Sequence, residues 1–203
     1  MTTQLEQVLS AIDDINRQDS NVTLVNKEAQ PKELVYGQRM SECLTKYWPN
    51  SNDLLKIAVR AQHIKRWHLK RNEFKEGKAG YYQWRIALGK FHAELAAQLM
   101  LAQGYSEQQA ETVASIICKE NLKDKSDNQL TKDSQTLEDV ACLVFLTHYF
   151  DEFASQYIKQ DNEAKIIRIV KLTWNKMSTE AHDIALTLSL PDHLANIVNK
   201  ALS

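Results

Sequence analysis

Apolar residues recur at spacings of three and four along almost the whole chain, and this periodicity restricts the fold more than any other feature. At the N-terminus, Leu5, Val8, Leu9, Ile12 and Ile15 would share one face of a helix. Glycine and proline, which form tight turns, are scarce, because the 203 residues include five glycines and three prolines. We therefore predict an all-α fold and exclude a fold rich in strands or loops.

Proline, glycine and capping residues divide the chain into predicted helices. Pro31 begins one helix at its first turn, and Gly104 ends another at its C-terminal cap. Ser106 begins the next helix, with Gln109 as its capping-box partner. Ser51 or Asn52 caps the helix before the basic residues, which are predicted to be helical as far as residue 69. The predicted helices cover residues 31–48, 51–69, 81–103, 107–118, 136–157, 163–177, 179–190 and 192–202, with a polar loop at 73–80.

The chain is long enough for one domain with a real core, and no repeat or low-complexity linker divides it. We therefore expect residues 1–203 to form a single helical domain. No apolar run approaches the length needed to span a bilayer, and the N-terminus lacks the pattern of a signal peptide. The three cysteines, Cys43, Cys118 and Cys142, are far apart and form no Cys-x-x-Cys pair, which favours a reducing cytoplasm without disulfides. The sequence does not indicate an oligomeric state.

Basic residues are concentrated in one part of the chain. Between residues 56 and 90 there are ten Lys and Arg against two Glu, although the formal net charge of the whole chain is −1. We call residues 56–90 the basic block. Such a block can attract an anionic ligand, phosphate above all. The alternative is a solvated helix face that interacts with acidic neighbours.

The chain has no glycine-rich phosphate loop, no nucleophile elbow and no His-Glu-x-x-His motif. The remaining candidates for chemistry are His63, His92 and the acidic pair Glu138-Asp139, which fall on different predicted helices. Imidazole and carboxylate groups suit a divalent cation that keeps positions open for water and substrate. Manganese, iron, magnesium, zinc or cobalt would each be compatible with these ligands. Arg66 and Arg85 would then stabilise charge in the transition state.

Three stretches resemble the HD superfamily of helical, metal-dependent phosphohydrolases: "QHIKRW", "FHAELAAQLMLAQGYSEQQAETVASII" and "QTLEDVACLVFL". The resemblance implies an HD-like core at about residues 51–160 with flanking helices, and a divalent metal held by His63, His92 and Asp139. The family's adjacent His-Asp pair is not present, because Ala93 follows His92. The implied site is therefore one ligand short unless Glu120 or Glu138 contributes.

Each of these candidates also has a structural explanation. His63 and His92 can be hydrogen-bonded histidines of a helical core. Asp139 lies three residues after Thr136 and can complete a capping box. For the same region we predict substrate-binding residues, since aromatic rings can stack on bases while cations hold phosphates. These residues are Arg60, Lys65, Trp67, Tyr82 and Trp84. Aromatic residues at helical spacing can equally belong to the core.

Nearly the whole chain resembles an uncharacterised family, domain of unknown function family 4202. The matching phrases are "LVYGQRMSECL", "GYYQWR", "FHAEL", "QTLEDVACLVFL" and "KLTWNKMS". Some members of that family are labelled glutamyl-tRNA synthetase. Lys176-Met177-Ser178 is similar to a synthetase signature, but the chain has no His-Ile-Gly-His motif and no nucleotide-binding βαβ unit. We interpret Ser178 as the cap of the next helix.

These patterns lead to three hypotheses. The first is an HD-like helical protein that binds a phosphorylated small molecule or nucleotide near His63, Arg66, Arg85, His92 and Asp139, and hydrolyses it if a divalent metal is bound. The second is a protein without catalytic activity that binds RNA or tRNA through the basic block. The third is a helical adaptor without a small ligand.

Overall fold

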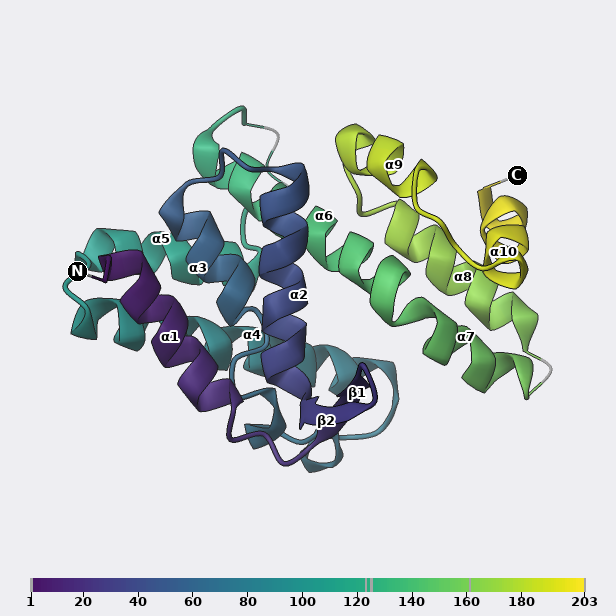
Figure 1. Cartoon of the computed structure of the whole chain (residues 1–203), viewed down its shortest axis with the longest axis horizontal. Coiled ribbons are helices and arrows are strands. Elements are labelled where there is room, and N and C mark those ends of the chain that lie inside the picture. The colour runs from purple at the N-terminus through teal and green to yellow at the C-terminus, as the bar shows by residue number, and fades with distance from the viewer. Residues whose placement is uncertain (1, 123, 125, 161, 203) are drawn as a thin grey trace. The chain divides into compact units, whose positions relative to one another are not determined.

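The computed structural model describes residues 2–122, 124, 126–160 and 162–202 of the chain. Over these residues the prediction of an all-α fold is confirmed, with ten α-helices and one two-stranded sheet (Figure 1). The chain forms two compact units, Met1–Leu137 and Glu138–Ser203. The single helical domain over residues 1–203 stays a prediction. Among the described residues, no helix is long and apolar enough to cross a membrane.

In the first unit, helices α3, α4 and α5 pack together, and α1 and α2 cover α3 (Figure 1). Side chains that are fully buried come from each of these helices, among them Ile12, Met40, Ile57, Met100 and Ile116. The elements are α1 (Gln4–Asn16), β1 (Val22–Val25), β2 (Glu28–Pro31), α2 (Lys32–Tyr47), α3 (Asp53–Ala61), α4 (Gly77–Ala102), α5 (Glu107–Cys118) and the first part of α6 (Gln129–His148).

The caps predicted at Asn52, Gly104 and Ser106 are confirmed. The Asn52 side chain accepts a hydrogen bond from the backbone of Leu55 at the start of α3. Ser106 and Gln109 form the capping box of α5. Gly104 follows α4 with a φ angle of +84°, which is the left-handed conformation that favours glycine at a helix end. These caps succeed as predictions because they depend on residues close together in sequence.

A β-hairpin before α2 was not predicted. Strands β1 and β2 pair antiparallel, with Val25 opposite Glu28. Asn26 and Lys27 form the two-residue turn, and both have positive φ angles, 51° and 71°. Such turns usually contain Asn-Gly or Asp-Gly, so Asn-Lys gave only a weak signal. Helix α2 begins directly after Pro31, as predicted.

The predicted helix over residues 51–69 is wrong in its second half, because α3 ends at Ala61. Lys65 adopts a left-handed conformation with a φ angle of 51°, and its backbone N–H donates to Asn16 Oδ1 over 2.9 Å. Two short 3-10 helices follow, η1 (Arg66–His68) and η2 (Arg71–Glu73). The basic block therefore runs from a helix through turns into a second helix, and does not form one helix face.

Helix α4 begins at Gly77, four residues earlier than predicted, so the polar loop at 73–80 is shorter than expected. The first turn of α4 requires glycine at position 80. A Cβ atom built on Gly80 would lie 1.8 Å from the carbonyl oxygen of Lys75, so no larger residue fits without moving the backbone. The turn at Lys75 and the first turn of α4 thus pack directly against each other.

The second unit contains the remaining part of α6 and helices α7 (Phe150–Ile158), α8 (Glu163–Trp174), α9 (Thr179–Leu186) and α10 (Asp192–Leu202). Helix α8 packs against α7 and α10. The predicted helix at 136–157 starts earlier, at Gln129, and is interrupted at Tyr149. Thr136 therefore lies inside α6, and the capping box proposed for Thr136 and Asp139 is wrong. Ser178 caps α9, as predicted.

Arg60 was predicted to bind substrate, but its guanidinium group pairs with Asp13 of α1. Arg60 Nε donates to Asp13 Oδ1 over 2.7 Å, and Nη2 donates to Oδ2 over 2.6 Å. The two side chains are only 13% and 16% exposed. The geometry is bidentate, and this pair links α3 to α1.

We expect Arg60→Ala to lower the free energy of unfolding by about 2–4 kcal/mol, because it leaves a largely buried carboxylate without its partner. Arg17→Ala is the control, since Arg17 pairs with Asp14 on the exposed side of α1 and should cost less than about 1 kcal/mol. Urea unfolding of both variants measures the difference. If Arg60→Ala and Arg17→Ala lowered the free energy of unfolding equally, the Arg60–Asp13 pair would stabilise the fold no more than an exposed ion pair does.

Candidate functional site

A pocket of about 310 Å³ lies in the first unit, between the turn after α3, the N-terminal half of α4 and the C-terminal end of α5. Four cationic side chains line this pocket, whereas Glu120 is the one acidic residue among the lining residues that the structure describes. The cationic residues are Arg66, Arg85, Lys90 and Lys119. The pocket therefore has a marked positive charge.

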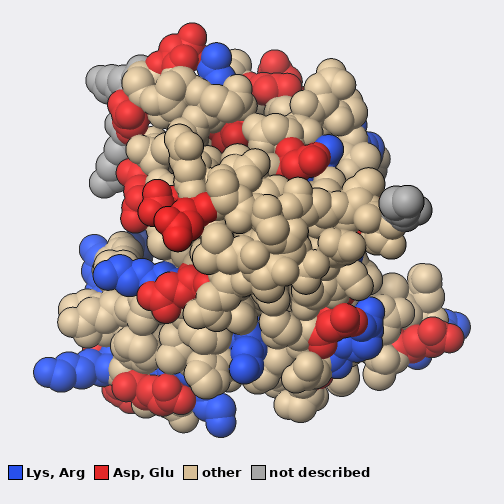
Figure 2. Space-filling view, turned by 90° about the vertical axis from the view of Figure 1, so that its left-hand side faces the viewer, with Lys and Arg blue, Asp and Glu red and all other residues tan. Residues whose placement is uncertain are grey.

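Local structure explains how these residues come together. Arg85 and His92 are seven residues apart on α4, so they lie on the same face of the helix. His63 and Arg66 are in the turn that ends α3 and in η1, which brings them over α4. Lys119 is the C-cap of α5, with a left-handed φ angle of 57°. On the face shown in Figure 2, most Lys and Arg side chains lie in the lower half of the view.

His63 has a defined partner at each ring nitrogen. Arg66 Nη1 donates to His63 Nε2 over 2.8 Å, and His63 Nδ1 lies 3.3 Å from Glu33 Oε2. Burial, and then the positive charge of Arg66, hold the pKa of His63 well below its usual range. The imidazole is therefore neutral near pH 7. Since Nε2 accepts from Arg66, the proton of the neutral ring is on Nδ1, the nitrogen that lies 3.3 Å from Glu33 Oε2.

Tyr36 of α2 completes the surroundings of His63. The two rings are stacked, with centroids 4.0 Å apart and an angle of 14° between their planes. Tyr36 also donates its hydroxyl hydrogen to Gln62 Oε1 over 3.0 Å. These contacts fix the ring plane of His63 and so the direction in which its nitrogens point.

Glu33 is a residue of this site that the sequence analysis missed. Its backbone N–H donates to Asp19 Oδ2 over 3.2 Å, and its carbonyl oxygen lies 3.5 Å from Asn16 Nδ2. The residue is 8% exposed, and burial raises the pKa of its carboxyl group to about 7, against the opposing effect of Arg66. In the sequence it is an ordinary acidic residue in the first turn of a helix, so no local signal distinguishes it.

His92 is the most isolated polar side chain of the pocket. Its ring centroid lies 6.0 Å from that of His63, and the residue is 3% exposed. Burial lowers the pKa of His92 to about 2, with further contributions from His63 and Arg66, while a hydrogen bond to the backbone of Gln62 opposes this change. Nε2 is buried and has no hydrogen-bond partner among the described residues. The neutral ring thus presents an acceptor that no protein group uses.

The predicted substrate-binding residues differ in their positions. Tyr82 lines the pocket. Trp84 does not, but its Nε1 donates to the carbonyl of Leu69 and its ring lies 5.2 Å from the guanidinium carbon of Arg66. It can therefore position Arg66 through a cation–π contact. Lys65 and Trp67 are not among the lining residues, and neither is Arg60.

Asp139 and Glu138 belong to the second unit and have partners there. Asp139 Oδ1 and Oδ2 accept hydrogen bonds from the backbone N–H and the hydroxyl of Ser178, over 2.8 and 2.6 Å. Glu138 Oε1 lies 3.2 Å from Lys176 Nζ. Both carboxylates thus stabilise the start of α9 and the residues before it.

The donors of the pocket do not fit a divalent cation. His63 Nε2 already accepts from Arg66, so a metal at this nitrogen would have to displace a guanidinium group. The surrounding cations would also repel it, and Glu120 is engaged by the hydroxyl of Ser115. Within the described part of the chain, no three His, Cys, Asp or Glu side chains are grouped so that they could hold a metal ion.

These observations define an all-helical protein with a cationic pocket built around two neutral imidazoles. The chain belongs to the family described as Domain of unknown function (DUF4202), whose model matches residues 6–198. No curated protein and no solved structure matches it. The predicted family membership is thereby confirmed, whereas the HD resemblance and the synthetase label are not.

The raised pKa of Glu33 predicts a pH-dependent contribution to stability. The folded protein binds this proton more tightly than the unfolded chain, whose carboxyl titrates near 4.5. Between pH 4.5 and 7 this contribution therefore falls as the pH rises, by an amount on the order of 3 kcal/mol. Relative to the wild type, Glu33→Gln should gain stability over this window, as measured by urea unfolding at several pH values. His63 and His92, whose pKa shifts act in the opposite sense, are present in both proteins. If the free energies of unfolding of Glu33→Gln and the wild type differed by a constant amount from pH 4.5 to 8, the raised pKa of Glu33 would be disproved.

The Asp139–Ser178 contacts predict that Asp139 is needed for the stability of the second unit. Ser178→Ala should lower the free energy of unfolding by about 1–2 kcal/mol, because it removes the cap of α9 and a hydrogen bond to a carboxylate. The effect of Asp139→Ala should overlap with it, so the double variant should lose less than the sum. Asp183→Ala, an exposed acid on α9, is the control. If the double variant lost the full sum of the two single losses in free energy of unfolding, Asp139 would not act through Ser178.

Proposed function

We propose that this protein binds a phosphorylated small molecule or nucleotide, with the phosphate in the pocket of the first unit. The observation that supports this proposal is the convergence of Arg66, Arg85 and Lys119 on two imidazoles that cannot add further positive charge by protonation near pH 7. Guanidinium groups recognise phosphate through paired N–H donors. A dianionic ligand would offset the repulsion among these cations.

The acceptor on His92 adds a second requirement for the ligand. Its unused Nε2 can receive a hydrogen bond from an O–H or N–H group of the bound molecule. A phosphate monoester, whose second pKa lies near 6, provides such an O–H in its monoanionic form. A sugar hydroxyl next to the phosphate provides one at any pH. Simple inorganic anions without a donor, such as chloride, would leave this nitrogen unsatisfied.

The site supports binding more directly than hydrolysis. A histidine whose pKa is about 2 accepts a hydrogen bond but is a weak general base, because an efficient base has a pKa near the working pH. Metal-dependent phosphohydrolase activity would require a cation that the donors of this pocket do not fit. Elemental analysis of the purified protein, before and after reconstitution with manganese, together with an assay of phosphate release, tests this activity separately from binding.

RNA or tRNA is the second candidate ligand, favoured by exposed aromatic rings next to cations at the start of α4. Tyr81 and Tyr82 are 42% and 54% exposed, and Lys78 Nζ lies 5.9 Å from the ring of Tyr82. Aromatic rings and cations in this arrangement bind single strands by stacking and by charge. Affinity for an RNA oligonucleotide should then fall steeply with salt, because phosphate contacts release counterions.

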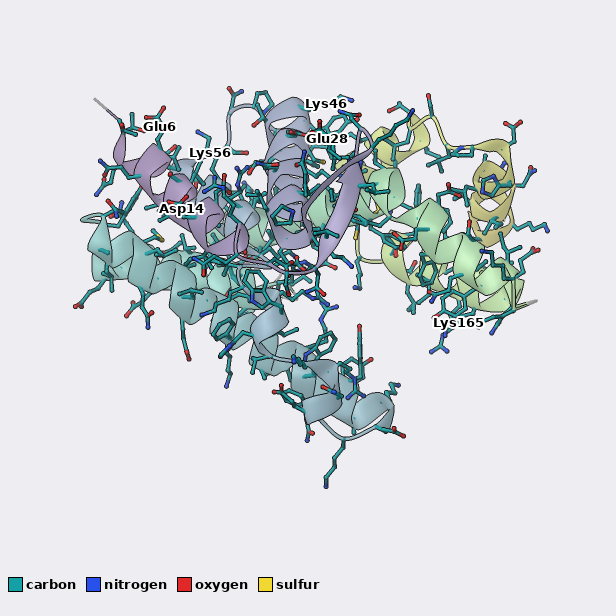
Figure 3. The ribbon with its side chains drawn as sticks, turned by 60° about the horizontal axis from the view of Figure 1, so that its bottom comes forward. Glu6, Asp14, Glu28, Lys46, Lys56 and Lys165 are labelled. Atoms are coloured by element: carbon teal, nitrogen blue, oxygen red, sulfur yellow. The ribbon has the colours of Figure 1, made fainter. Side chains whose placement is uncertain are left out.

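We expect Arg85→Ala to weaken the binding of a phosphate monoester at least about tenfold, since a charge-assisted hydrogen bond contributes about 1.5–3 kcal/mol. Ribose 5-phosphate is the probe, and isothermal titration calorimetry is the measurement. The matched control is Lys56→Ala, because Lys56, labelled in Figure 3, belongs to α3 and pairs with Asp53 outside the pocket. Equal affinities of the two variants and the wild type, or no binding by any of them, would overturn the proposal.

A further inference from the structure

The pocket wall formed by α4 extends well beyond the phosphate-binding residues. Tyr82, Ile86, Gly89 and His92 all line the pocket, and they follow one another at intervals of four, three and three residues. This spacing places them in one row along the helix. With a rise of 1.5 Å per residue, the row is ~15 Å long. A phosphate group bound near His92 would occupy only one end of it.

Gly89 differs from Gly37 and Gly80, which lie inside helices of the first unit. Gly77, the first residue of α4, also has open space around it, but its φ angle of +82° favours glycine. A Cβ atom on Gly37 would lie 3.1 Å from the carbonyl oxygen of Arg60, which is a tight contact, and one on Gly80 would clash with Lys75, so packing requires glycine at position 80. A Cβ atom on Gly89 would meet no atom within 4 Å. Glycine inside a helix costs about 0.5–1 kcal/mol relative to alanine, and no neighbour in the structure requires it here.

The position of Gly89 gives this residue a role in the pocket. It lies on the wall between the buried His92 and the exposed end of the row, so its missing side chain leaves a strip of bare backbone. Bare backbone permits a flat group to approach the helix closely. A methyl group at this place would project into the space of the pocket.

The outer end of the row is apolar, although cations surround it. Ile86 is 61% exposed and Tyr82 is 54% exposed, and both line the pocket. A large apolar side chain and an aromatic ring beside a bare strip of helix form a surface for a planar ring, which could stack on Tyr82 and cover Ile86. In Figure 3 the N-terminal end of α4 extends away from α1 and α2.

We infer that the pocket selects phosphate esters that carry a planar ring, with the phosphate at His92 and the cations and the ring lying over Gly89 against Tyr82 and Ile86. This inference deepens the proposed function and rests on it. It identifies Gly89 as the residue that determines specificity and defines the ligand class as mononucleotides and molecules of similar shape. A ligand with a sugar phosphate alone would bind the inner end of the row and leave the outer end exposed.

Three probes measure the contributions of the two ends of the row to binding separately: inorganic phosphate, ribose 5-phosphate and AMP. Calorimetric titration of the wild-type protein should give AMP an affinity at least about tenfold higher than that of ribose 5-phosphate, because stacking on an aromatic ring adds to the phosphate contacts. Tyr82→Ala should reduce this advantage. Gln83→Ala is the matched control, since Gln83 is the neighbouring exposed residue and does not line the pocket.

Substitution of Gly89 provides the decisive test. Gly89→Ala and the larger Gly89→Leu should progressively lower the ratio of the AMP affinity to the ribose 5-phosphate affinity, because the added side chain occupies the strip on which the ring would lie. Both variants should unfold at the same or a higher temperature than the wild type, because they improve helix propensity, and loss of folding would therefore not explain the result.

The outcomes distinguish the inference from the proposed function. Equal affinity for ribose 5-phosphate and AMP, unchanged by Gly89→Leu, would overturn the ring-binding wall and leave the phosphate site standing. Binding of none of the three probes would overturn both. Binding of a single-stranded RNA oligonucleotide without binding of AMP would overturn the inference in favour of the second candidate ligand.

Discussion

The buried amide of Asn16, at the end of α1, holds the turn after α3, which lines the pocket, against the first turn of α2. Its Oδ1 accepts from the backbone of Lys65, and its Nδ2 lies 3.5 Å from the carbonyl oxygen of Glu33. The residue is 1% exposed, so loss of the amide would leave buried backbone groups without a partner. By fixing the turn after α3 against the first turn of α2, this amide allows His63 to meet Glu33.

The ionisation states of the pocket follow from this arrangement. The carboxyl group of Glu33 is buried beside an imidazole, and its pKa rises to about 7, while burial and nearby cations keep both histidines neutral. The positive charge of the pocket thus resides on Arg and Lys side chains and not on histidine. A phosphate group would meet a site whose charge varies little with the protonation of histidine. The carboxyl group of Glu33 lies beside His63, and the positive charge of Arg66 partly opposes the rise of its pKa.

The sequence analysis selected several residues of the pocket, but not its cations Lys90 and Lys119, and interpreted parts of it differently. His63, His92, Arg66, Arg85 and Tyr82 were all selected as candidates, and the structure brings them together in the first unit. They were found because bases, aromatic residues and histidines are concentrated in one stretch. The metal site with Asp139 and Glu138 stays a prediction, and in the structure those carboxylates contact Ser178 and Lys176. Arg60 was selected on its charge alone, and only the contact with Asp13 reveals its structural role.

By itself the sequence determined the helical fold, the caps of α3, α5 and α9 and the position of the basic block, because these depend on periodicity and on residues within a few positions of one another. The tertiary structure decided where α3 ends and which carboxylate lies beside His63. It also left His92 Nε2 without a hydrogen-bond partner among the described residues. Those facts depend on contacts between residues far apart in the chain, such as Asn16 with Lys65 and Glu33 with His63. Burial then sets the pKa values, and burial is a property of the packed molecule that a single sequence does not specify.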